Sequence, residues 1–390
     1  MGDALEGRFP RGKSLMLNYS AAVLGGGNTA FAVAANLALQ GAVITLCELP
    51  EFESMIAPIR RSRTIRLDGV AAQGTAELRD VTTDLAATLE HHDLLLLIVP
   101  SYGHREWIAA LGEFLAPGHT LVMMPGNLGT LEAVRTLHEE GLDPETMGFC
   151  LAETDTAPYV CRKLTPDSAH IWGVVSQLGL GVYPAVDGPD TAALLAPLFP
   201  TDGLAGSPSA VRLYTDVLEC GLSAMNPVVH PPGVLMNAGR VERSRGEFYF
   251  YDEGVTPAVC SVIEALDAER REIGAALGYD LPSVAEAFHA AGFGPKGDLW
   301  ATINGSRMLT ALRAPGAIRT RWLTEDVPFG LAAWASLAAE LDVETPVMDS
   351  LVHLGCVAAD IPFDVGRGAE DLGLAGLEPS EMRRVASGAV

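Results

Sequence analysis

The order of apolar and polar positions along the chain divides it into two halves of different architecture. In the first half, short apolar runs alternate with stretches of helical length and period. This alternation predicts an α/β fold, a doubly wound and mostly parallel sheet over residues 20–205. The expected strands are Ser20–Leu24, Ala42–Cys47, Asp93–Val99, Thr120–Met124, Thr146–Leu151, His170–Ser176 and Gly181–Tyr183, the expected helices are Thr29–Gln40 and Asp84–Glu90, and Ile65–Leu67 with Thr75–Leu78 form a small insertion.

In the second half the period changes to that of helices. Thr256-Pro257 places an N-cap residue before a proline at the first helical position, and an apolar stripe follows as far as Gly278. Thr345-Pro346 begins another helix in the same way. We therefore expect residues 206–390 to form an all-α domain. Residues 1–19 carry mixed charges without an apolar signal core, and they are expected to form an extension.

Composition and charge exclude several classes of protein. The 390 residues are 48% apolar and carry a net charge of −23, so the chain can bury a large core and repels phosphate backbones and anionic membranes. The longest strongly apolar run, Leu94–Val99, is too short to span a bilayer. Six scattered cysteines without a C-x-x-C pair indicate reduced thiols and no metal site. We expect a cytoplasmic protein without nucleic acid or membrane partners.

A glycine-rich turn between the first strand and the first helix predicts a dinucleotide site. Gly25 and Gly27 follow the strand and Ala30 opens the helix, which gives the pattern G-x-G-x-x-A. Glycine allows the tight turn and the close approach of pyrophosphate, and the small third residue allows close packing of helix on strand. Asn28 and Thr29 would stand at the helix N-terminus, which faces the phosphates. The N-terminal domain is therefore expected to be a Rossmann-type domain that binds NAD or NADP.

Further residues at the strand ends bear on the choice of cofactor. Glu48 ends the second strand, where a carboxylate would bind the ribose hydroxyls and repel a 2′-phosphate, so NADH is favoured. Pro100 and Gly126 lie in loops that follow buried strands and are expected to border the nicotinamide, although both also suit ordinary turns. NADPH is the second choice of cofactor, because a nearby arginine could fold over the ribose and bind a 2′-phosphate. Alternatively, these arginines form a solvated face of the domain. The cluster consists of Arg60, Arg61, Arg63 and Arg66.

The second half contains two polar patches that suggest catalysis. In the first patch, Asn226-Pro227-Val228-Val229-His230-Pro231-Pro232, the tandem prolines are expected to stop any regular helix. Asn226 and His230 are four residues apart, so a helical turn would place both on one face. A histidine beside an amide, in a protein that binds a dinucleotide, suggests proton transfer coupled to hydride transfer. The alternative is that His230 has only a structural role, with its hydrogen bonds satisfied inside a helical core.

The second patch, at residues 319–329, combines two arginines and two acids around a tryptophan. An arginine of this patch, Arg319 or Arg321, would suit a substrate carboxylate, and one of the acids could hold one nitrogen of an imidazole and thereby fix the tautomer of the other. Alternatively, Thr324 and the acids that follow it merely cap the helix that continues beyond them. His104, just after the Pro100 loop, is the other histidine that deserves a check.

Taken together, these motifs resemble the octopine/nopaline dehydrogenases, the opine dehydrogenase family. The motifs are N-P-x-x-H with P-x-x-x-L-M-N-A-G-R, F-Y-F-Y-D-E-G-V-T-P, R-x-L-T-E-D-V-P-F-G, the glycine pattern and Glu153-Thr154-Asp155-Thr156-Ala157-Pro158-Tyr159. The resemblance spans roughly residues 20–380. It implies a Rossmann domain followed by an all-α domain similar to that of 6-phosphogluconate dehydrogenase. It also implies reductive condensation of an amino acid with a 2-oxo acid, using NADH or NADPH.

The resemblance assigns roles to individual residues. His230 corresponds to the catalytic histidine, Asp326 to its aspartate partner and Asn226 to a nearby asparagine. Arg321 corresponds to the arginine that binds the 2-oxo acid carboxylate, with Arg319 as the local rival. Glu153 is placed with the cofactor-binding residues. The candidates for the amino acid pocket, which are equally suited to packing, are Tyr159, Tyr251, Trp300, Asn304 and Trp322.

Several alternatives stay open from the sequence. A metallophore-type opine synthase would condense a larger amine. A simple 2-hydroxy acid or ketopantoate-like dehydrogenase would use a lysine as general acid, and the second half offers only Lys296, outside any motif. A non-catalytic NAD(P)-binding sensor would not need the histidine and aspartate. The sequence identifies neither the amino acid nor the 2-oxo acid, with pyruvate as first choice, and it leaves a homodimer as one option for the assembly.

Overall fold

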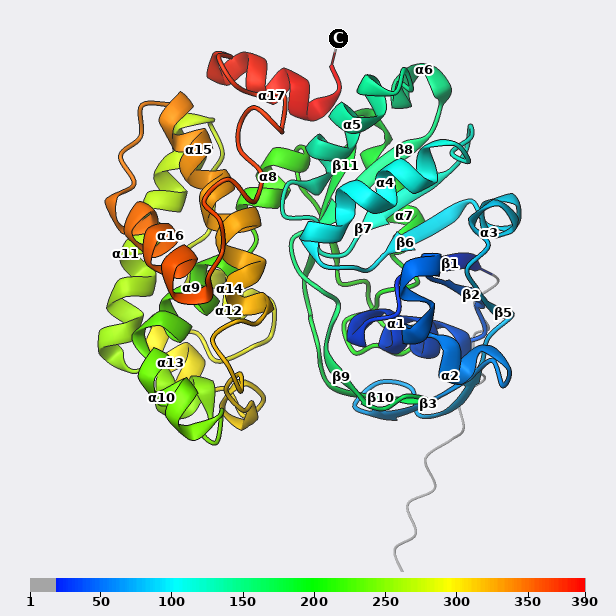
Figure 1. Ribbon diagram of the computed structural model, residues 1–390, viewed down its shortest axis with the longest axis horizontal. Coiled ribbons are helices and arrows are strands. Elements are labelled where there is room, and N and C mark those ends of the chain that lie inside the picture. Colours follow the sequence, from blue (N-terminus) through cyan, green and yellow to red (C-terminus); the bar gives the residue numbers. More distant parts are fainter. Residues whose placement is uncertain (1–18, 390) are drawn as a thin grey trace, which may run out of the picture.

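The computed structural model describes residues 19–389 and shows two domains side by side (Figure 1). The predicted extension, 1–19, lies almost entirely outside the described residues. In the view of Figure 1 the α/β domain is on the right and the helical domain on the left, with the C-terminal helix above the junction. This arrangement confirms the predicted fold class.

The first domain is built on an eight-stranded sheet in which β1 is central. Six neighbouring strands are parallel, and β11 is antiparallel to β8. In spatial order the strands are β12 (Val211–Leu213), β11 (Leu178–Tyr183), β8 (Cys150–Thr154), β7 (Thr120–Met123), β6 (Leu94–Leu97), β1 (Ser20–Leu24), β2 (Val43–Cys47) and β5 (Asp80–Thr82). The sheet ends with Leu213, somewhat beyond the boundary predicted at residue 205.

Both faces of this sheet are covered, because alternate apolar residues of each buried strand point to opposite sides. Leu95 and Leu97 belong to the core beneath α4 and α5, whereas Leu94 and Leu96 belong to the core around α1. The helical segments of the domain are α1 (Asn28–Leu39), η1 (Pro50–Met55), α2 (Ala57–Arg60), α3 (Leu85–His91), η2 (Ser101–Gly103), α4 (His104–Gly112), α5 (Gly129–Glu139), α6 (Pro144–Met147), η3 (Ala185–Asp187) and α7 (Gly188–Leu195).

A second, four-stranded sheet lies against α1, and its extent was not predicted. Its order is β4 (Gly74–Glu77), β3 (Thr64–Gly69), β10 (Ser168–Val174) and β9 (Tyr159–Thr165). The strand expected at His170–Ser176 therefore belongs to this sheet. β9 was not predicted because charged residues interrupt its apolar pattern: Arg162 is exposed, and Lys163, on the opposite face, is half-buried against α1. The strand expected at Thr146–Leu151 begins only at Cys150, because Asp143 caps a helical turn, α6, just before it.

The second domain is all helical, as predicted. The N-cap and proline signals mark the starts of its two longest helices, α11 and α16. α17 returns to the first domain and packs on α8 and β11 (Figure 1). Its segments are α8 (Val217–Leu222), α9 (Asn226–Met236), α10 (Ala238–Ser244), η4 (Phe250–Gly254), α11 (Pro257–Ala276), α12 (Val284–Ala290), α13 (Leu299–Asn304), η5 (Leu309–Ala311), α14 (Arg321–Thr324), η6 (Asp326–Leu331), α15 (Ala332–Glu340), α16 (Pro346–Ala359) and α17 (Pro379–Ser387).

The expectation that Pro231 and Pro232 stop the helix is wrong. α9 continues through both prolines to Met236. The two rings are buried, and the helix packs against α11, α16 and η6. Tertiary packing therefore outweighs the local loss of backbone hydrogen bonds, and it keeps His230 on the same helix as Asn226. Among residues 19–389, no helix combines the length and apolar character that crossing a membrane requires.

Candidate active site

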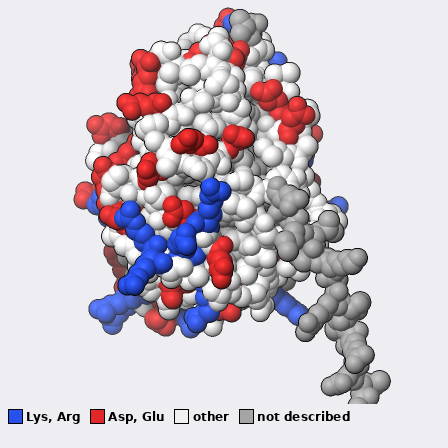
Figure 2. Space-filling model, turned by 90° about the vertical axis from the view of Figure 1, so that its right-hand side faces the viewer, with Lys and Arg blue, Asp and Glu red and all other residues white. Residues whose placement is uncertain are grey.

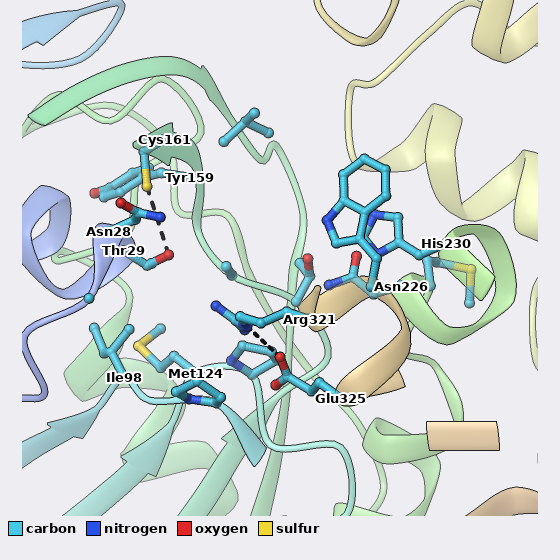
Figure 3. A pocket seen from close by; sticks show the side chains of 18 of the residues that line it. Asn28, Thr29, Ile98, Met124, Tyr159, Cys161, Asn226, His230, Arg321 and Glu325 are labelled. Atoms are coloured by element: carbon cyan, nitrogen blue, oxygen red, sulfur yellow. Dashed lines mark hydrogen bonds and ion pairs between the residues drawn. The ribbon is translucent and has the colours of Figure 1, made fainter. Parts of the chain in front are cut away.

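One cavity of about 1030 Å³ lies between the two domains and collects most of the predicted site residues. It runs from the glycine turn of α1, past the carboxyl ends of the central strands, to α9, η4 and α14 of the helical domain. Figure 3 shows Asn28, Thr29, Tyr159 and Cys161 on one side and His230 with Asn226 on the other, with Arg321 reaching into the space between.

The glycine turn has the geometry that a bound pyrophosphate requires. Gly25 has φ +116°, and a Cβ there would lie 2.6 Å from the carbonyl oxygen of Ile98. Gly27 has open space where its Cβ would be, and α1 begins without a side-chain cap. Its first N–H groups are therefore free to bind phosphate oxygens. Asn28 and Thr29 line the cavity, whereas Ala30 is buried in the packing of the helix.

Glu48 lies beside this turn, as predicted for a ribose-binding acid. It is only 4% exposed, lines the cavity, and accepts a hydrogen bond from the backbone N–H of Leu49 (2.9 Å). Burial raises the pKa of Glu48, and backbone hydrogen bonds from Leu49 and Gly26 oppose this shift.

The arginine cluster that left NADPH open faces solvent. None of its four members lines the cavity, and basic side chains gather on the outer face of the first domain (Figure 2). Arg60 pairs with Glu53, and Arg66 lies 3.8 Å from Asp68. The cluster is therefore the solvated face that the sequence offered as its alternative, and it does not line the cavity.

The cation at the cofactor end is instead Lys163 of β9, which the sequence did not reveal. Its ammonium group donates to the carbonyl oxygens of Gly26 (3.2 Å) and Met55 (3.1 Å), and it lies 3.4 Å from the centre of the Phe31 ring. Its backbone N–H donates to the side chain of Asn28 (2.9 Å). Burial lowers the pKa of Lys163 to about 8. A positive charge thus stands beside the phosphate-binding turn of an otherwise acidic protein.

Two residues predicted for the cofactor site support the cavity wall from behind. Pro100 lines the cavity, but Gly126 and Glu153 do not. Glu153 is fully buried and accepts hydrogen bonds from the N–H groups of Leu128 (2.9 Å) and Thr130 (2.8 Å) at the start of α5. Gly126 is packed on it, since a Cβ at this position would lie 2.3 Å from that of Glu153. The carboxylate therefore stabilises a loop and a helix N-terminus, not the cofactor.

At the other end of the cavity His230 and Asp326 form a hydrogen-bonded pair. Nδ1 of His230 is 2.8 Å from Oδ2 of Asp326. Because a carboxylate only accepts, Nδ1 carries the proton, and Nε2 is left as the acceptor that Tyr251 Oη approaches at 3.3 Å. Trp322 stacks on the imidazole at 4.3 Å and 4°. Burial raises the pKa of Asp326, and the hydrogen bond from His230 works against that shift.

The local backbone explains how Asp326 reaches this position. α14 ends at Thr324, and a π-helical segment, η6, begins at Asp326. The Thr324 hydroxyl bonds to the carbonyl oxygen of Thr320 (3.1 Å), so it does not cap the following helix as the alternative interpretation required. A π-helical segment changes the angular spacing of its side chains, and such segments are frequent at functional sites. Asn226, one turn before His230, also lines the cavity.

The two candidate arginines are separated by the structure. Arg321 lines the cavity, and its Nε donates to Glu325 Oε2 (2.5 Å). Glu325 in turn accepts hydrogen bonds from the backbone N–H (2.9 Å) and the hydroxyl (3.0 Å) of Ser101 in the other domain. Arg319 does not line the cavity: its side chain is 65% exposed and lies 3.5 Å from Asp360. Its proposed role as a substrate ligand is therefore not supported.

A second contact between the domains involves Arg367, which the sequence gave no reason to select. The side chain is buried and donates to the carbonyl oxygens of Gly126 (3.1 Å) and Asn127 (2.5 Å) and to Glu132 (2.7 Å). Arg367 thereby fixes the loop that follows β7 against the helical domain.

The remaining candidates divide between the cavity wall and the protein interior. Tyr251 and Trp322 line the cavity, whereas Trp300 and Asn304 do not. Tyr159 lines it too, but its hydroxyl accepts a hydrogen bond from Asn36 (2.8 Å), which is a packing arrangement. His104 is buried against Gly129, away from the cavity, and burial lowers its pKa.

A glycine turn and a histidine–aspartate pair at opposite ends of one interdomain cavity define the protein class: a two-domain oxidoreductase dependent on NAD or NADP. The family profile described as "NAD/NADP octopine/nopaline dehydrogenase, alpha-helical domain" matches residues 213–359. An opine dehydrogenase from Arthrobacter sp. (strain 1C) is 29% identical over 364 residues, which cover 93% of this chain and 97% of that protein. The match to this family profile and the similarity to this relative bear out the predicted resemblance to the opine dehydrogenase family.

Solved structures show the same fold. Octopine dehydrogenase in complex with NADH and agmatine superimposes with a TM-score of 0.74 at 18% identity, over 96% of this chain and 99% of that one. Yersinopine dehydrogenase bound to NADP+ gives a TM-score of 0.68 at 15% identity, over 95% and 98% of the two chains. These structures confirm the predicted fold, a Rossmann domain followed by a helical domain.

Proposed function

We propose that the enzyme is an opine dehydrogenase that condenses the amine of an amino acid with a 2-oxo acid, pyruvate first among them, and reduces the product with NADH or NADPH. The observation that carries this proposal is the meeting of three groups in one cavity. His230, held by Asp326, supplies a proton acceptor, Arg321 supplies a charge for a carboxylate, and the glycine turn supplies a dinucleotide site.

The residues suit each chemical step. Nε2 of His230 accepts a proton from the attacking ammonium group, so that the free amine adds to the carbonyl carbon of the oxo acid. The imidazolium, stabilised by Asp326, returns a proton to the carbinolamine hydroxyl, which leaves as water and gives an imine. Arg321 orients the oxo acid through its carboxylate. A nicotinamide cofactor held at the glycine turn would supply the hydride for the imine carbon, so that the overall products would be a secondary amine with two carboxylates, oxidised cofactor and water.

The direct test is NADH oxidation with purified enzyme, pyruvate and a mixture of amino acids. Oxidation that needs both pyruvate and an amino acid supports the proposal. Oxidation with the oxo acid alone would contradict it and would favour a simple hydroxy acid dehydrogenase. The site argues against that alternative, because Lys296, the one lysine of the helical half, does not line the cavity. The hydrogen-bonded His230–Asp326 pair likewise argues against a mere NAD(P)-binding sensor.

Replacing Glu48 by glutamine should narrow the preference for NADH over NADPH. Glu48 faces the cavity next to Gly26, where its charge would repel a 2′-phosphate. The measurement is the ratio of kcat/KM for the two cofactors in wild type and variant. A wild type that already prefers NADPH, or a ratio that the substitution leaves unchanged, would remove Glu48 from cofactor selection.

Lys163 should make cofactor affinity depend on pH. As the pH rises through about 8, the pKa of this side chain, the ammonium group loses its charge beside the phosphate-binding turn. The kcat/KM for NADH should therefore fall above that pH. Lys163→Met should lower it by about tenfold at pH 7, on the scale of one charge-assisted hydrogen bond, and should abolish this pH step. If kcat/KM for NADH still falls above that pH in Lys163→Met, a group other than Lys163 is responsible for the pH dependence.

A homodimer in the cytoplasm remains part of the proposal. Leu354, Val357 and Phe363 expose 59%, 68% and 60% of their surface on and just after α16, which offers an apolar contact surface. Sedimentation velocity would decide the assembly, and a mass equal to the single chain would contradict a dimer.

A further inference from the structure

We infer that the amine substrate is an amino acid with an apolar side chain, aliphatic or aromatic, which occupies a chamber of the same cavity beneath α12. The inference rests on the proposed function and specifies the substrate class of that site. We call this part of the cavity the α12 chamber. Its wall is formed by Ala287, Phe288, Phe293, Met308, Leu309 and Leu312.

The α12 chamber is a constructed, largely apolar pocket. Phe288 and Phe293 meet edge to face with ring centres 5.4 Å apart, and the backbone N–H of Phe293 donates to the carbonyl oxygen of Phe288 (2.9 Å). The other domain closes the chamber from its side. Ser176 donates to the carbonyl oxygens of Ala291 (3.1 Å) and Ala290 (2.9 Å), and the sulfur of Met308 packs on Gly173 of β10.

A chain of direct contacts joins this chamber to the proton-transfer pair. The carbonyl oxygen of Leu312 accepts a hydrogen bond from the N–H of Phe250 (2.9 Å). The Phe250 ring lies 4.6 Å from Trp322, which stacks on His230 at 4.3 Å. Tyr251, the next residue, approaches Nε2 of His230. His230, Tyr251 and the α12 chamber also line the same cavity, so an amino acid with its amine at His230 would direct its side chain toward this chamber.

The charges around the cavity disfavour a basic side chain. Among the described residues that line it, five are acids. Three of them are hydrogen-bonded to other protein groups, and the other two lie at the dinucleotide end of the cavity. Glu325 is held by Ser101 and Arg321, and Asp326 by His230. Glu48 lies at the dinucleotide end, and its pKa is influenced by the neighbouring Glu106.

The fifth acid, Asp155, is similarly committed to the protein. It accepts hydrogen bonds from the N–H of Gly179 (2.9 Å) and the hydroxyl of Tyr214 (3.0 Å), and burial raises its pKa to about 6. The charged wall residues that adjoin the chamber residues in sequence are Arg307 and Arg313, both exposed. The Arg313 guanidinium lies over the Tyr249 ring and 3.9 Å from Glu247. A guanidinium or ammonium side chain would thus find no carboxylate in the chamber wall, whereas an apolar one would be removed from water against carbon.

The test is a panel of amino acids with pyruvate and NADH held at saturation: leucine, phenylalanine, alanine, arginine and glutamate. We expect kcat/KM for leucine or phenylalanine to exceed the values for arginine and glutamate by about tenfold or more, the scale on which an apolar pocket discriminates. A best substrate with a charged side chain would overturn the inference and leave the proposed function standing. Turnover with none of the amino acids would overturn both.

A matched pair of variants on α12 localises the effect. Ala287 faces the chamber, whereas Ala290, on the same helix, is exposed and does not line it. Ala287→Glu should lower kcat/KM for leucine by about tenfold and raise the ratio of arginine to leucine, because it places a carboxylate in the chamber. Ala290→Glu adds the same charge and should leave this ratio unchanged. Equal ratios in two folded variants would overturn the inference, and the wild-type panel tests it even if Ala287→Glu does not fold.

Discussion

Replacing His230 by alanine should lower turnover by about 100-fold or more while leaving the affinity for NADH nearly intact, on the usual scale of general acid–base catalysis. The variant removes the imidazole whose Nε2 accepts the proton of the amine in the proposed mechanism. It touches none of the residues at the glycine turn, which lie at the other end of the cavity (Figure 3). Steady-state kinetics with pyruvate and the best amino acid give the turnover, and calorimetry gives the NADH affinity.

His353→Ala is the matched control for this experiment. His353 lies on α16 of the same domain, is exposed and does not line the cavity; its ring centre is 4.7 Å from that of Phe363, with the two rings tilted by 39°. This variant should keep wild-type turnover. Unchanged turnover in His230→Ala would remove His230 from the mechanism. A parallel loss of NADH affinity would instead indicate that the imidazole, on which Trp322 stacks, mainly holds the cavity in shape.

The sequence was most informative where one short segment determines both local structure and chemistry. The glycine turn is such a segment, since Gly25 needs its positive φ and its close approach to Ile98 whatever the rest of the chain does. The same holds for the strands on either side of it. The pairing of His230 with Asp326 spans 96 positions, and only the family resemblance could suggest it. The structure brings the two side chains into contact.

The sequence was misleading where the role of a residue depends on distant packing. Pro231 and Pro232 signal the end of a helix, yet burial between neighbouring helices carries α9 through them. Glu153 lies in a family motif, but its carboxylate accepts hydrogen bonds from backbone N–H groups at the start of α5. Lys163 follows the exposed Arg162 in β9, and only the packing of β9 on α1 places its ammonium group at the glycine turn.

The contacts between the domains link the catalytic elements to the cofactor loops. Ser101 follows Pro100 at the end of a central strand, and it donates twice to Glu325, the residue before Asp326. Arg367 holds the loop after β7 in a similar way. Asp326 and the cofactor loops are therefore fixed relative to one another. The proposed reaction requires this, because hydride transfer to the imine carbon and proton transfer at the neighbouring nitrogen take place on one substrate molecule.

Arg321→Ala should raise the KM for the 2-oxo acid by about 10- to 100-fold with a smaller change in kcat, because it deletes a charge-assisted contact that is already made in the ground state. Arg321 reaches the cavity while Glu325, itself anchored on Ser101, holds its Nε (Figure 3). Arg319→Ala is the matched control, two positions away, exposed and directed to Asp360, and should behave as wild type. The measurement is the dependence of the initial rate on pyruvate at saturating NADH and amino acid. A normal KM in Arg321→Ala, or a raised one in Arg319→Ala, would contradict the assignment of the carboxylate to Arg321.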